Sequence, residues 1–489
     1  MNRISLLAAG LLLFSGCAIL QFGGRPSDPV EALRYDIDQI LSDSIFIPSN
    51  ASVTIASLST GEQLYAREPH LLLRPASNMK LLTSSAALQY LGLQFDFLTE
   101  VLVDSTDSSG TVHGNIFLKG FGDPDLTDSD LDSLASLVKL QGINRVSGDV
   151  VADVSYFDSL YWGMGWMWDD EPYSYEAFIS PLCVDDNCVS IQVIPAPAPA
   201  DSATVILTPQ TDYVTLVNHV RTVSDTALVP LKITRLYMQR LNTIIVEGEV
   251  VASADTVEDQ LTVWRPELYA GTLFREALQR QGIPVTGGVQ AGTVPSLAVP
   301  RAALSRPIDT VLVHMNKVSD NLSAENFLKT ISATQGGEPG SSEFGIWKIN
   351  EFLDGLGIDT TKILMVDGSG VSHYNLLTTS MLVQLLEGMA SRTDVFPLFY
   401  RSLPVAGRDG TLESRMRGTP AEGNLHAKTG TISGACSLSG YVTDRDGEML
   451  VFSMMMQNYI GSARRYRYAQ DRIGALLAGF SRGRRFATY

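Results

Sequence analysis

A serine and a lysine three residues apart, Ser77 and Lys80, have the types and spacing for nucleophilic chemistry. An apolar stretch follows them, and three residues along a helix would put the hydroxyl and the amine on one face. A serine hydroxyl becomes a nucleophile when a base accepts its proton, and a lysine can serve if its pKa falls from about 10.4 toward neutrality. The pair predicts acyl transfer by a serine enzyme that uses no histidine. Roughly one Ser-x-x-Lys match is expected by chance in a chain of this composition, so a solvated helix face is the alternative.

Two further motifs lie downstream. The polar turn Ser319-Asp320-Asn321 precedes a predicted helix, and taken alone it would be an ordinary helix cap. Lys428-Thr429-Gly430-Thr431 has strand character on both sides. Its cation, its hydroxyl and the bare backbone edge at the glycine could hold a carboxylate and pair with an extended peptide.

These three motifs, in this order, resemble the signature of the penicillin-recognising serine enzymes. The stretches at residues 407–412 and 418–423 are similar to one family among them, the S13 peptidases. These are D-alanyl-D-alanine carboxypeptidases and endopeptidases, also called class C low-molecular-mass penicillin-binding proteins. Further stretches that resemble this family are residues 122–124, 165–170 and 366–372. The resemblance extends from about Ala51 to the C-terminal helix.

Carried over by position, the resemblance implies a catalytic set of five residues: Ser77, Lys80, Ser319, Asn321 and Lys428. Ser77 would attack the carbonyl of a terminal D-alanyl-D-alanine while Lys80 takes its proton, and water would later hydrolyse the acyl-enzyme. Ser319 would relay a proton to the leaving amine, and Asn321 would place the substrate amide and help to hold Lys80. The charge of Lys428, together with burial of the amine, would help to keep Lys80 deprotonated.

The resemblance also implies how the substrate is held. Thr429 and Gly430 would bind it, with Thr429 meeting its carboxylate, and the backbone N–H groups of Ser77 and Thr431 would form the oxyanion hole. Asp153 aligns with a family aspartate that recognises the ammonium end of a diamino acid, although a solvated acid at a strand end is the alternative. A β-lactam would mimic the dipeptide and leave a slowly hydrolysed adduct. The reaction needs no cofactor.

The chain is acidic and begins with an export signal. Its 489 residues suggest two or three domains, and its net charge of -17 disfavours nucleic acid as the main partner. Residues 1–17 combine a basic start, an apolar run and a Ser15-Gly16-Cys17 end that resembles a lipoprotein cleavage site, with residues 18–30 as a tether. A lipid on Cys17 would anchor the protein to a membrane of the cell envelope, in the periplasm. Phe14 stands where that pattern usually has Leu, which leaves a soluble secreted form open.

Three cysteines remain after the signal. Cys183 and Cys188 bracket a loop-like stretch of four residues, which an oxidising compartment could close as a disulfide. A metal site is less favoured, because the sequence has no second cysteine or histidine pair at ligand spacing. Cys436, in an apolar segment, is expected to be buried.

The elements that must position these residues predict an α/β (α+β) fold. A hairpin turning at Thr60-Gly61 precedes the helix that begins near Ser77, and a β-meander over residues 426–458 precedes a last helix over residues 464–480. We expect a penicillin-binding, β-lactamase-like transpeptidase domain whose sheet is flanked by helices. This domain would be discontinuous, formed by residues 31–94 and 265–489, with one or two β-rich insert domains over residues 95–264.

The sequence therefore predicts a serine DD-carboxypeptidase that also cuts D-alanyl cross-links in peptidoglycan as an endopeptidase. A β-lactamase or esterase on the same domain, and a non-catalytic scaffold of the envelope, are the alternatives. An intact set of motif residues favours an enzyme over a scaffold.

Overall fold

The two ends of the chain meet in one antiparallel sheet. The computed structural model describes residues 25–483, so Cys17 and the expected signal lie outside the described residues. The strand order is β16-β17-β18-β1-β2. These strands are β1 (Asn50–Ser57), β2 (Gln63–Arg67), β16 (His426–Ile432), β17 (Ala435–Thr443) and β18 (Met449–Gln457). The pairing confirms the expected hairpin and the expected meander.

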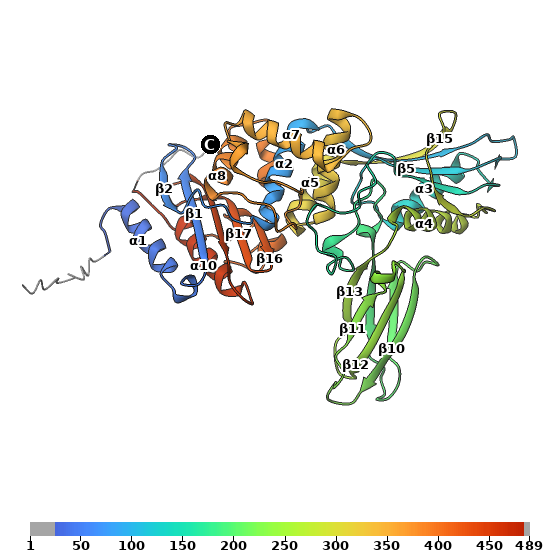
Figure 1. Ribbon diagram of the computed structural model, residues 1–489, viewed down its shortest axis with the longest axis horizontal. Coiled ribbons are helices and arrows are strands. Elements are labelled where there is room, and N and C mark those ends of the chain that lie inside the picture. The colour runs from blue at the N-terminus through green and yellow to red at the C-terminus, as the bar shows by residue number, and fades with distance from the viewer. Residues whose placement is uncertain (1–24, 484–489) are drawn as a thin grey trace, which may run out of the picture.

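Helices cover both faces of this sheet (Figure 1). Helices α1 (Pro29–Leu41) and α10 (Arg464–Ala478) pack together on one face, and α8 (Thr379–Ala390) lies against β1 and β18 on the other. Because both faces are covered, β17 and β18 are buried over nearly their whole length and are mostly apolar or small in sequence. The last helix packs on the sheet as expected.

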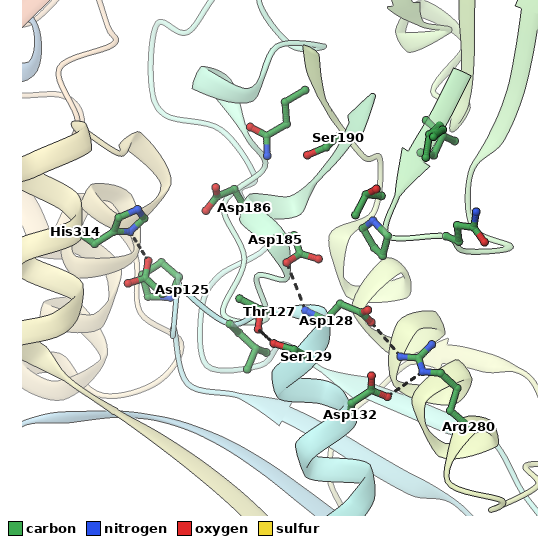
Figure 2. A pocket seen from close by; sticks show the side chains of 18 of the residues that line it. Asp125, Thr127, Asp128, Ser129, Asp132, Asp185, Asp186, Ser190, Arg280 and His314 are labelled. Atoms are coloured by element: carbon green, nitrogen blue, oxygen red, sulfur yellow. Dashed lines mark hydrogen bonds and ion pairs between the residues drawn. The ribbon is translucent and has the colours of Figure 1, made fainter. Parts of the chain in front are cut away.

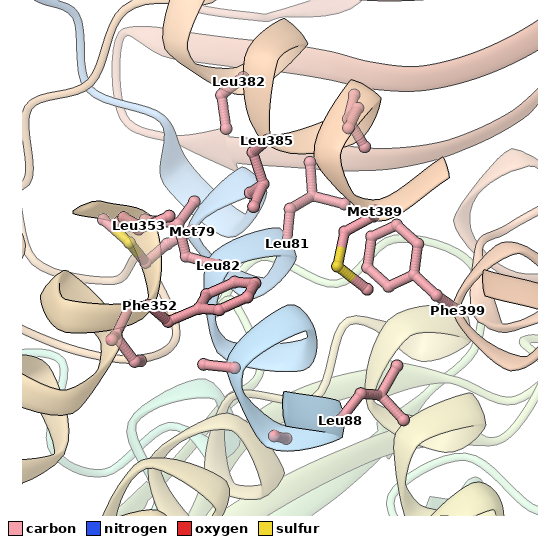
Figure 3. Close-up of a cluster of buried hydrophobic side chains, with 14 of the residues drawn as sticks. Met79, Leu81, Leu82, Leu88, Phe352, Leu353, Leu382, Leu385, Met389 and Phe399 are labelled. Carbon is pink, nitrogen blue, oxygen red and sulfur yellow. The ribbon is translucent and has the colours of Figure 1, made fainter. Parts of the chain in front are cut away.

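Helix α2 (Met79–Tyr90), which follows Ser77, lies at the centre of a large cluster of buried hydrophobic side chains (Figure 3). Its residues from Met79 to Leu88 are all buried, so it presents no solvated face. The helices that share this core are α5 (Ile308–Val318), α6 (Asn321–Gly336), α7 (Ser342–Gly355), α8 and α9 (Phe396–Ser402). Packing on all sides fixes the helix that carries the predicted base.

The segment between α2 and α5 forms a second sheet, two helices and a β-rich lobe, which extends away from the first sheet in Figure 1. The second sheet has the order β14-β7-β5-β3-β15. Its strands and helices are β3 (Asp96–Val103), β5 (Ile116–Gly120), β7 (Val150–Asp153), β14 (Val289–Ala291), β15 (Val299–Pro307), α3 (Asp128–Leu140) and α4 (Pro266–Arg280). A two-stranded pair joins β4 (Thr111–Val112) and β6 (Arg145–Val146).

The β-rich lobe consists of two three-stranded sheets, β13-β8-β9 and β10-β12-β11. Its strands are β8 (Cys188–Ile194), β9 (Thr204–Thr208), β10 (Thr215–Val223), β11 (Lys232–Arg235), β12 (Thr243–Val251) and β13 (Val257–Thr262).

The inserted segment extends beyond the boundary that the sequence suggested at residue 264. Helix α4 shares its core with α3 and β7, and β14 and β15 complete the second sheet. The sequence shows helical patterning from residue 266 onward, but these two later strands pair with β7 and β3, more than 130 residues before them. We therefore propose that the insert runs from about residue 95 to residue 307.

The expected disulfide is not formed. Cys183 and Cys188 are both free and buried, and Cys436 is buried as predicted. The Cys183 thiol donates to Ser180 O at 2.8 Å, and Asn326 Nδ2 donates to its sulfur at 3.3 Å. Internal polar contacts therefore occupy this sulfur in place of a covalent bond to Cys188.

Candidate active site

Ser77 stands in one turn of 3-10 helix, η2 (Ala76–Asn78), directly before α2. This turn is tied to the sheet, because Asn78 Nδ2 donates to the carbonyl of Lys428 at 2.9 Å. Ser77 is half-buried, whereas the residues on either side of it are buried. Its hydroxyl therefore lies where the core meets a cleft, at the foot of a fixed helix.

Lys80 is fully buried one turn further on and reaches back to the serine. Its Nζ lies 3.1 Å from Ser77 Oγ, 2.6 Å from Asn321 Oδ1 and 2.8 Å from the carbonyl of Ser369. None of these three groups is a carboxylate. The amine is therefore surrounded by partners that suit its neutral form as well as its charged form.

Burial is the main cause that brings Lys80 toward neutrality. It lowers the pKa of Lys80 to about 8, against the charges of Asp320, Asp367 and Glu325, which raise it. The expected repulsion between the two lysines acts mainly on Lys428. Burial, and then the charge of Lys80, lower the pKa of Lys428 well below its usual value. Of the two causes expected from the sequence, burial and the charge of Lys428, burial is the one that lowers the pKa of Lys80.

Ser319 and Asn321 occupy the joint between α5 and α6. Ser319 closes α5 in the left-handed conformation, with a φ of 68°, and Asp320 is the N-cap of α6. Asn321 opens α6, and its Nδ2 donates to the carbonyl of Tyr175 at 2.7 Å while its Oδ1 faces Lys80. The polar turn is thus both a helix cap and part of the site.

Strand β16 brings Lys428 and Gly430 to the same place. Lys428 Nζ donates to Ser319 Oγ at 2.7 Å and to the carbonyl of Thr429 at 3.1 Å. A Cβ on Gly430 would lie 2.9 Å from the backbone nitrogen of Ser77, closer than real Cβ atoms approach. Glycine is needed here because the strand runs directly past Ser77.

The turn at residues 366–372 supplies the third partner of Lys80, which the sequence marked only by resemblance. Asp367 shapes this turn by accepting from the backbone N–H groups of Gly370 at 2.9 Å and Ser372 at 2.7 Å. Glu325 of α6 lies beneath it and accepts from the N–H of Ser369 at 2.8 Å. The buried carboxylates thereby hold the carbonyl that faces the amine.

The three motifs meet in one cleft with two unlike ends, and Ser77 and Thr431 line both. One end is a cavity of about 540 Å³ lined by acids, aromatic rings and backbone, including Met167, Asp170, Tyr175, Glu176, Asn321, His373 and Tyr459. The other is a cavity of about 380 Å³ lined by hydroxyls and guanidinium groups, from Ser319, Thr411, Arg415, Thr429, Thr431 and Arg467.

Acids line the cleft, but Asp153 is not one of them. Asp153 is fully buried in β7, where its carboxylate accepts from the N–H groups of Ser155 at 2.9 Å and Val294 at 2.7 Å. Asp170 and Glu176 line the larger end instead. Burial, followed by the charge of Asp170, raises the pKa of Glu176 to about 8.

Two arginines at the smaller end were not predicted. Arg467 of α10 is exposed, and its Nη2 donates to Thr431 Oγ1 at 2.9 Å. Arg415 pairs with Asp471 at 2.7 Å, whereas no carboxylate within residues 25–483 forms an ion pair with Arg467. The sequence did contain a signal, because the run Arg464-Arg465-Tyr466-Arg467 is unusual in so acidic a chain.

A larger cavity, of about 1240 Å³, lies outside this cleft (Figure 2). Three of its carboxylates form local ion pairs: Arg280 contacts Asp128 at 3.2 Å and Asp132 at 2.9 Å, and His314 contacts Asp125 at 2.8 Å. The part of the chain that the structure describes contains no group of histidines, cysteines and acids arranged to hold a metal ion. We find no pair of nucleophile and base on the walls of this cavity.

Comparison with known proteins agrees with this geometry. A sequence model of the D-Ala-D-Ala carboxypeptidase 3 (S13) family matches residues 33–478. The chain is 39% identical to a D-alanyl-D-alanine carboxypeptidase of Actinomadura sp. (strain R39) over 464 residues, covering 92% of this chain and 85% of that protein. It is 29% identical over 387 residues to the D-alanyl-D-alanine carboxypeptidase DacB of Haemophilus influenzae, covering 78% of this chain and 80% of that one.

The fold comparison points the same way. The crystal structure of penicillin binding protein 4 (dacB) from Haemophilus influenzae superimposes with a TM-score of 0.81 at 25% sequence identity, covering 91% of this chain and 99% of that chain. The predicted α/β penicillin-binding fold is therefore confirmed.

Proposed function

Because this chain belongs to the D-Ala-D-Ala carboxypeptidase 3 (S13) family and is a serine-type D-alanyl-D-alanine carboxypeptidase, we propose that Ser77 is its acylated nucleophile. The observation that carries this proposal is the 3.1 Å approach of Lys80 Nζ to Ser77 Oγ at the floor of the cleft. The other pair of this kind in the three motifs is Lys428 with Ser319. Ser319 lines only the smaller end of the cleft, whereas Ser77 lines both ends.

The contacts of Lys80 fit a neutral amine that serves as the base. A neutral amine has two N–H donors and one lone pair. The Asn321 Oδ1 and Ser369 carbonyl oxygens can only accept, so they take the two donors. The lone pair is then free to receive the proton of Ser77 as its oxygen attacks the substrate carbonyl.

A second pair then serves the leaving group. Ser319 lines the cleft together with Ser77, and its Oγ accepts a hydrogen bond from Lys428 Nζ at 2.7 Å. Its hydroxyl would donate a proton to the nitrogen of the departing D-alanine and would regain one from the protonated Lys80. Water afterwards attacks the ester, with Lys80 again accepting a proton, and the Ser77 hydroxyl is restored. The backbone N–H groups of Ser77 and Thr431 would hold the carbonyl oxygen as negative charge develops on it.

The two ends of the cleft suggest the orientation of the substrate. The terminal carboxylate would lie at the smaller end, where Thr429 and Arg467 offer a hydroxyl and an unpaired guanidinium group. The acyl portion of the stem peptide would occupy the larger end. An ammonium group on that portion would meet Asp170, which takes the role first expected of Asp153.

We expect the same cleft to accept D-alanyl cross-links as substrates. There the leaving amine belongs to a second stem peptide, whose carboxylates would also face the guanidinium groups of Arg415 and Arg467. A β-lactam carries a carboxylate beside its reactive amide, so we expect it to acylate Ser77 in the same orientation.

Location in the cell envelope follows from the activity, since the substrate is peptidoglycan. We propose that Cys17 is lipidated and anchors the enzyme to a membrane, on the strength of the Ser15-Gly16-Cys17 motif. Within residues 25–483, no helix has the length and apolar character needed to cross a membrane. Mass spectrometry of the mature N-terminus would test the anchor, and an unmodified Cys17 would contradict it.

A labelled penicillin tests the assignment of the nucleophile. We expect one label on each wild-type chain and none on Ser77→Ala, together with a loss of D-alanine release from diacetyl-Lys-D-Ala-D-Ala of more than about 10³-fold. Equal thermal unfolding midpoints would show that the variant is folded. Labelling that survives in Ser77→Ala would overturn the assignment.

A further inference from the structure

Four of the five tryptophans of the chain line a single cavity of about 550 Å³ outside the catalytic cleft. Trp162, Trp166 and Trp168 come from the loop that follows β7, and Trp264 comes from the end of β13. Trp162 stacks on Trp264 with ring centroids 6.0 Å apart, and Trp168 stacks on Tyr237 of the β-rich lobe at 6.4 Å. Loops from distant parts of the sequence thus place broad ring faces around one space.

Two side chains of the lining are unusually accessible for their size. Trp168 is 67% exposed, and Met238, which follows Tyr237 in the chain, is 66% exposed. Large apolar side chains gathered at a surface cavity lose favourable burial unless something covers them. A concentration of this kind therefore indicates a binding surface.

Two charged groups interrupt the apolar lining. Arg240 lies over the Trp264 ring, 5.0 Å from its centroid. Glu171 forms an ion pair with the buried Arg235. A purely hydrocarbon occupant would remove water from the Arg240 guanidinium group without replacing its hydrogen bonds, which is unfavourable. The lining suits a ligand that has flat apolar faces and a polar edge.

The cavity adjoins the catalytic cleft. Met167 lines both of them, and the indole N–H of Trp166 donates to Asp367 Oδ2 at 3.1 Å, in the turn that faces Lys80. An occupant of the cavity would thus lie next to the end of the cleft assigned to the acyl portion of the stem peptide. In peptidoglycan, that peptide is attached at its other end to a sugar of the glycan strand.

We propose that this cavity binds an N-acetylated hexosamine of the glycan strand that carries the stem peptide, an inference that rests on the proposed function. A pyranose ring with equatorial substituents has two faces of C–H bonds, which can stack on Trp168 and Trp162 while its hydroxyl and amide groups point outward. Those outward groups can hydrogen-bond to Glu171 and Arg240. The enzyme would then hold its substrate at the scissile peptide and at the sugar.

The first test measures sugar binding without catalysis. Calorimetric titration with a β-1,4-linked tetramer of N-acetylglucosamine, which carries no peptide, should give saturable binding to the wild-type enzyme. Trp168→Ala should bind it at least about fivefold more weakly. Trp347→Ala is the matched control, because this fifth tryptophan is 56% exposed on α7 and does not line the cavity.

The second test measures the contribution of the sugar to turnover. The wild-type kcat/KM should be higher for a disaccharide-linked stem peptide than for the same peptide without sugar, and Trp168→Ala should remove only this difference. Equal sugar binding by the wild type and Trp168→Ala, or no saturation with the wild type, would overturn the proposal. Failure to release D-alanine from the sugar-free peptide would instead contradict the proposed function and leave the calorimetric result standing.

Discussion

At the scale of single residues, the proposed role of Lys80 as the base predicts how the reaction depends on pH. Only its neutral form can accept the serine proton, and burial lowers its pKa to about 8. We therefore expect kcat/KM for diacetyl-Lys-D-Ala-D-Ala to rise with pH and to level off above about pH 8. The charge of Asp320 is the largest influence that raises this pKa, so Asp320→Asn, which keeps an N-cap on α6, should move the rising limb to lower pH. A limb that stays in place, or moves to higher pH, would contradict the assignment of Lys80.

Arg467 should favour substrates that end in a free carboxylate over substrates with an uncharged C-terminus. It donates to Thr431 Oγ1 and no carboxylate within residues 25–483 pairs with it, so its charge is available to the substrate. Arg467→Gln should raise KM about tenfold for a peptide that ends in a carboxylate and change it little for the same peptide with a C-terminal amide. Arg472→Gln is the matched control, since Arg472 lies on the same helix and does not line the cleft. Equal losses for both peptides would argue against carboxylate recognition.

At the scale of elements, strand β16 would form one wall of the proposed oxyanion hole, and Gly430 allows it to lie close to Ser77. A methyl group at this position would lie 2.9 Å from Ser77 N and 2.2 Å from Ser437 Oγ, so the strand and η2 would have to separate. Gly430→Ala should lower the rate of acylation by a labelled penicillin about 10²-fold, because small displacements of reacting groups are costly.

The control for Gly430→Ala is Gly355→Ala, in helix α7, where an added Cβ meets no atom within 4 Å. This substitution should leave acylation unchanged and should not destabilise the protein. Wild-type acylation rates in Gly430→Ala would show that β16 can accommodate the methyl group without disturbing Ser77.

The elements that depend on local pattern could be predicted from the sequence, and those that depend on distant partners could not. The hairpin at Thr60-Gly61 and the helix after Ser77 follow from turn residues and apolar spacing, and the structure confirms them. Asp153 sits at a strand end as expected, but its environment is set by Val294, 141 residues later. β14 and β15 likewise belong to a sheet whose other strands precede them by far, which no local pattern reveals.

The residues of the site also divide into those that could be predicted from the sequence and those that could not. The order of the motifs was enough to predict that Ser77, Lys80, Ser319, Asn321 and Lys428 lie in one site. In the structure Lys80 contacts Ser77 and Asn321, Lys428 contacts Ser319, and Ser77 and Ser319 line the same end of the cleft. The carbonyl of Ser369 was not foreseeable, because any residue type supplies a carbonyl oxygen. Nor could the sequence show that burial, more than Lys428, lowers the pKa of Lys80.

At the scale of the whole molecule, buried acids should make the fold more stable at mildly acidic pH than at neutral pH. Burial raises the pKa of many carboxyl groups of the described chain, and the pKa values are raised most clearly in these: Asp123 and Asp185 to about 6, Asp186 and Glu325 to about 7, and Glu176 to about 8. The folded chain holds these protons where the unfolded chain has released them. The resulting stability is fully present below the ordinary pKa of about 4 and is lost as pH rises through 6 to 8. His373 and His426, whose pKa values are lowered, oppose this trend in part.

The thermal unfolding midpoint should therefore be higher at pH 5 than at pH 7.5, so that the enzyme is least stable as it approaches the pH at which Lys80 becomes an effective base. Asp186 offers a sharp test, because it lines the large acidic cavity of Figure 2 and has a φ of 56°, which asparagine adopts readily. Asp186→Asn removes a charge that the folded state must bury at pH 7.5, and should raise the midpoint there by about 1–3 °C and by less at pH 5. A midpoint that rises steadily from pH 5 to pH 7.5 in the wild type would show that the histidines and surface charges, and not the buried acids, control the stability of this fold.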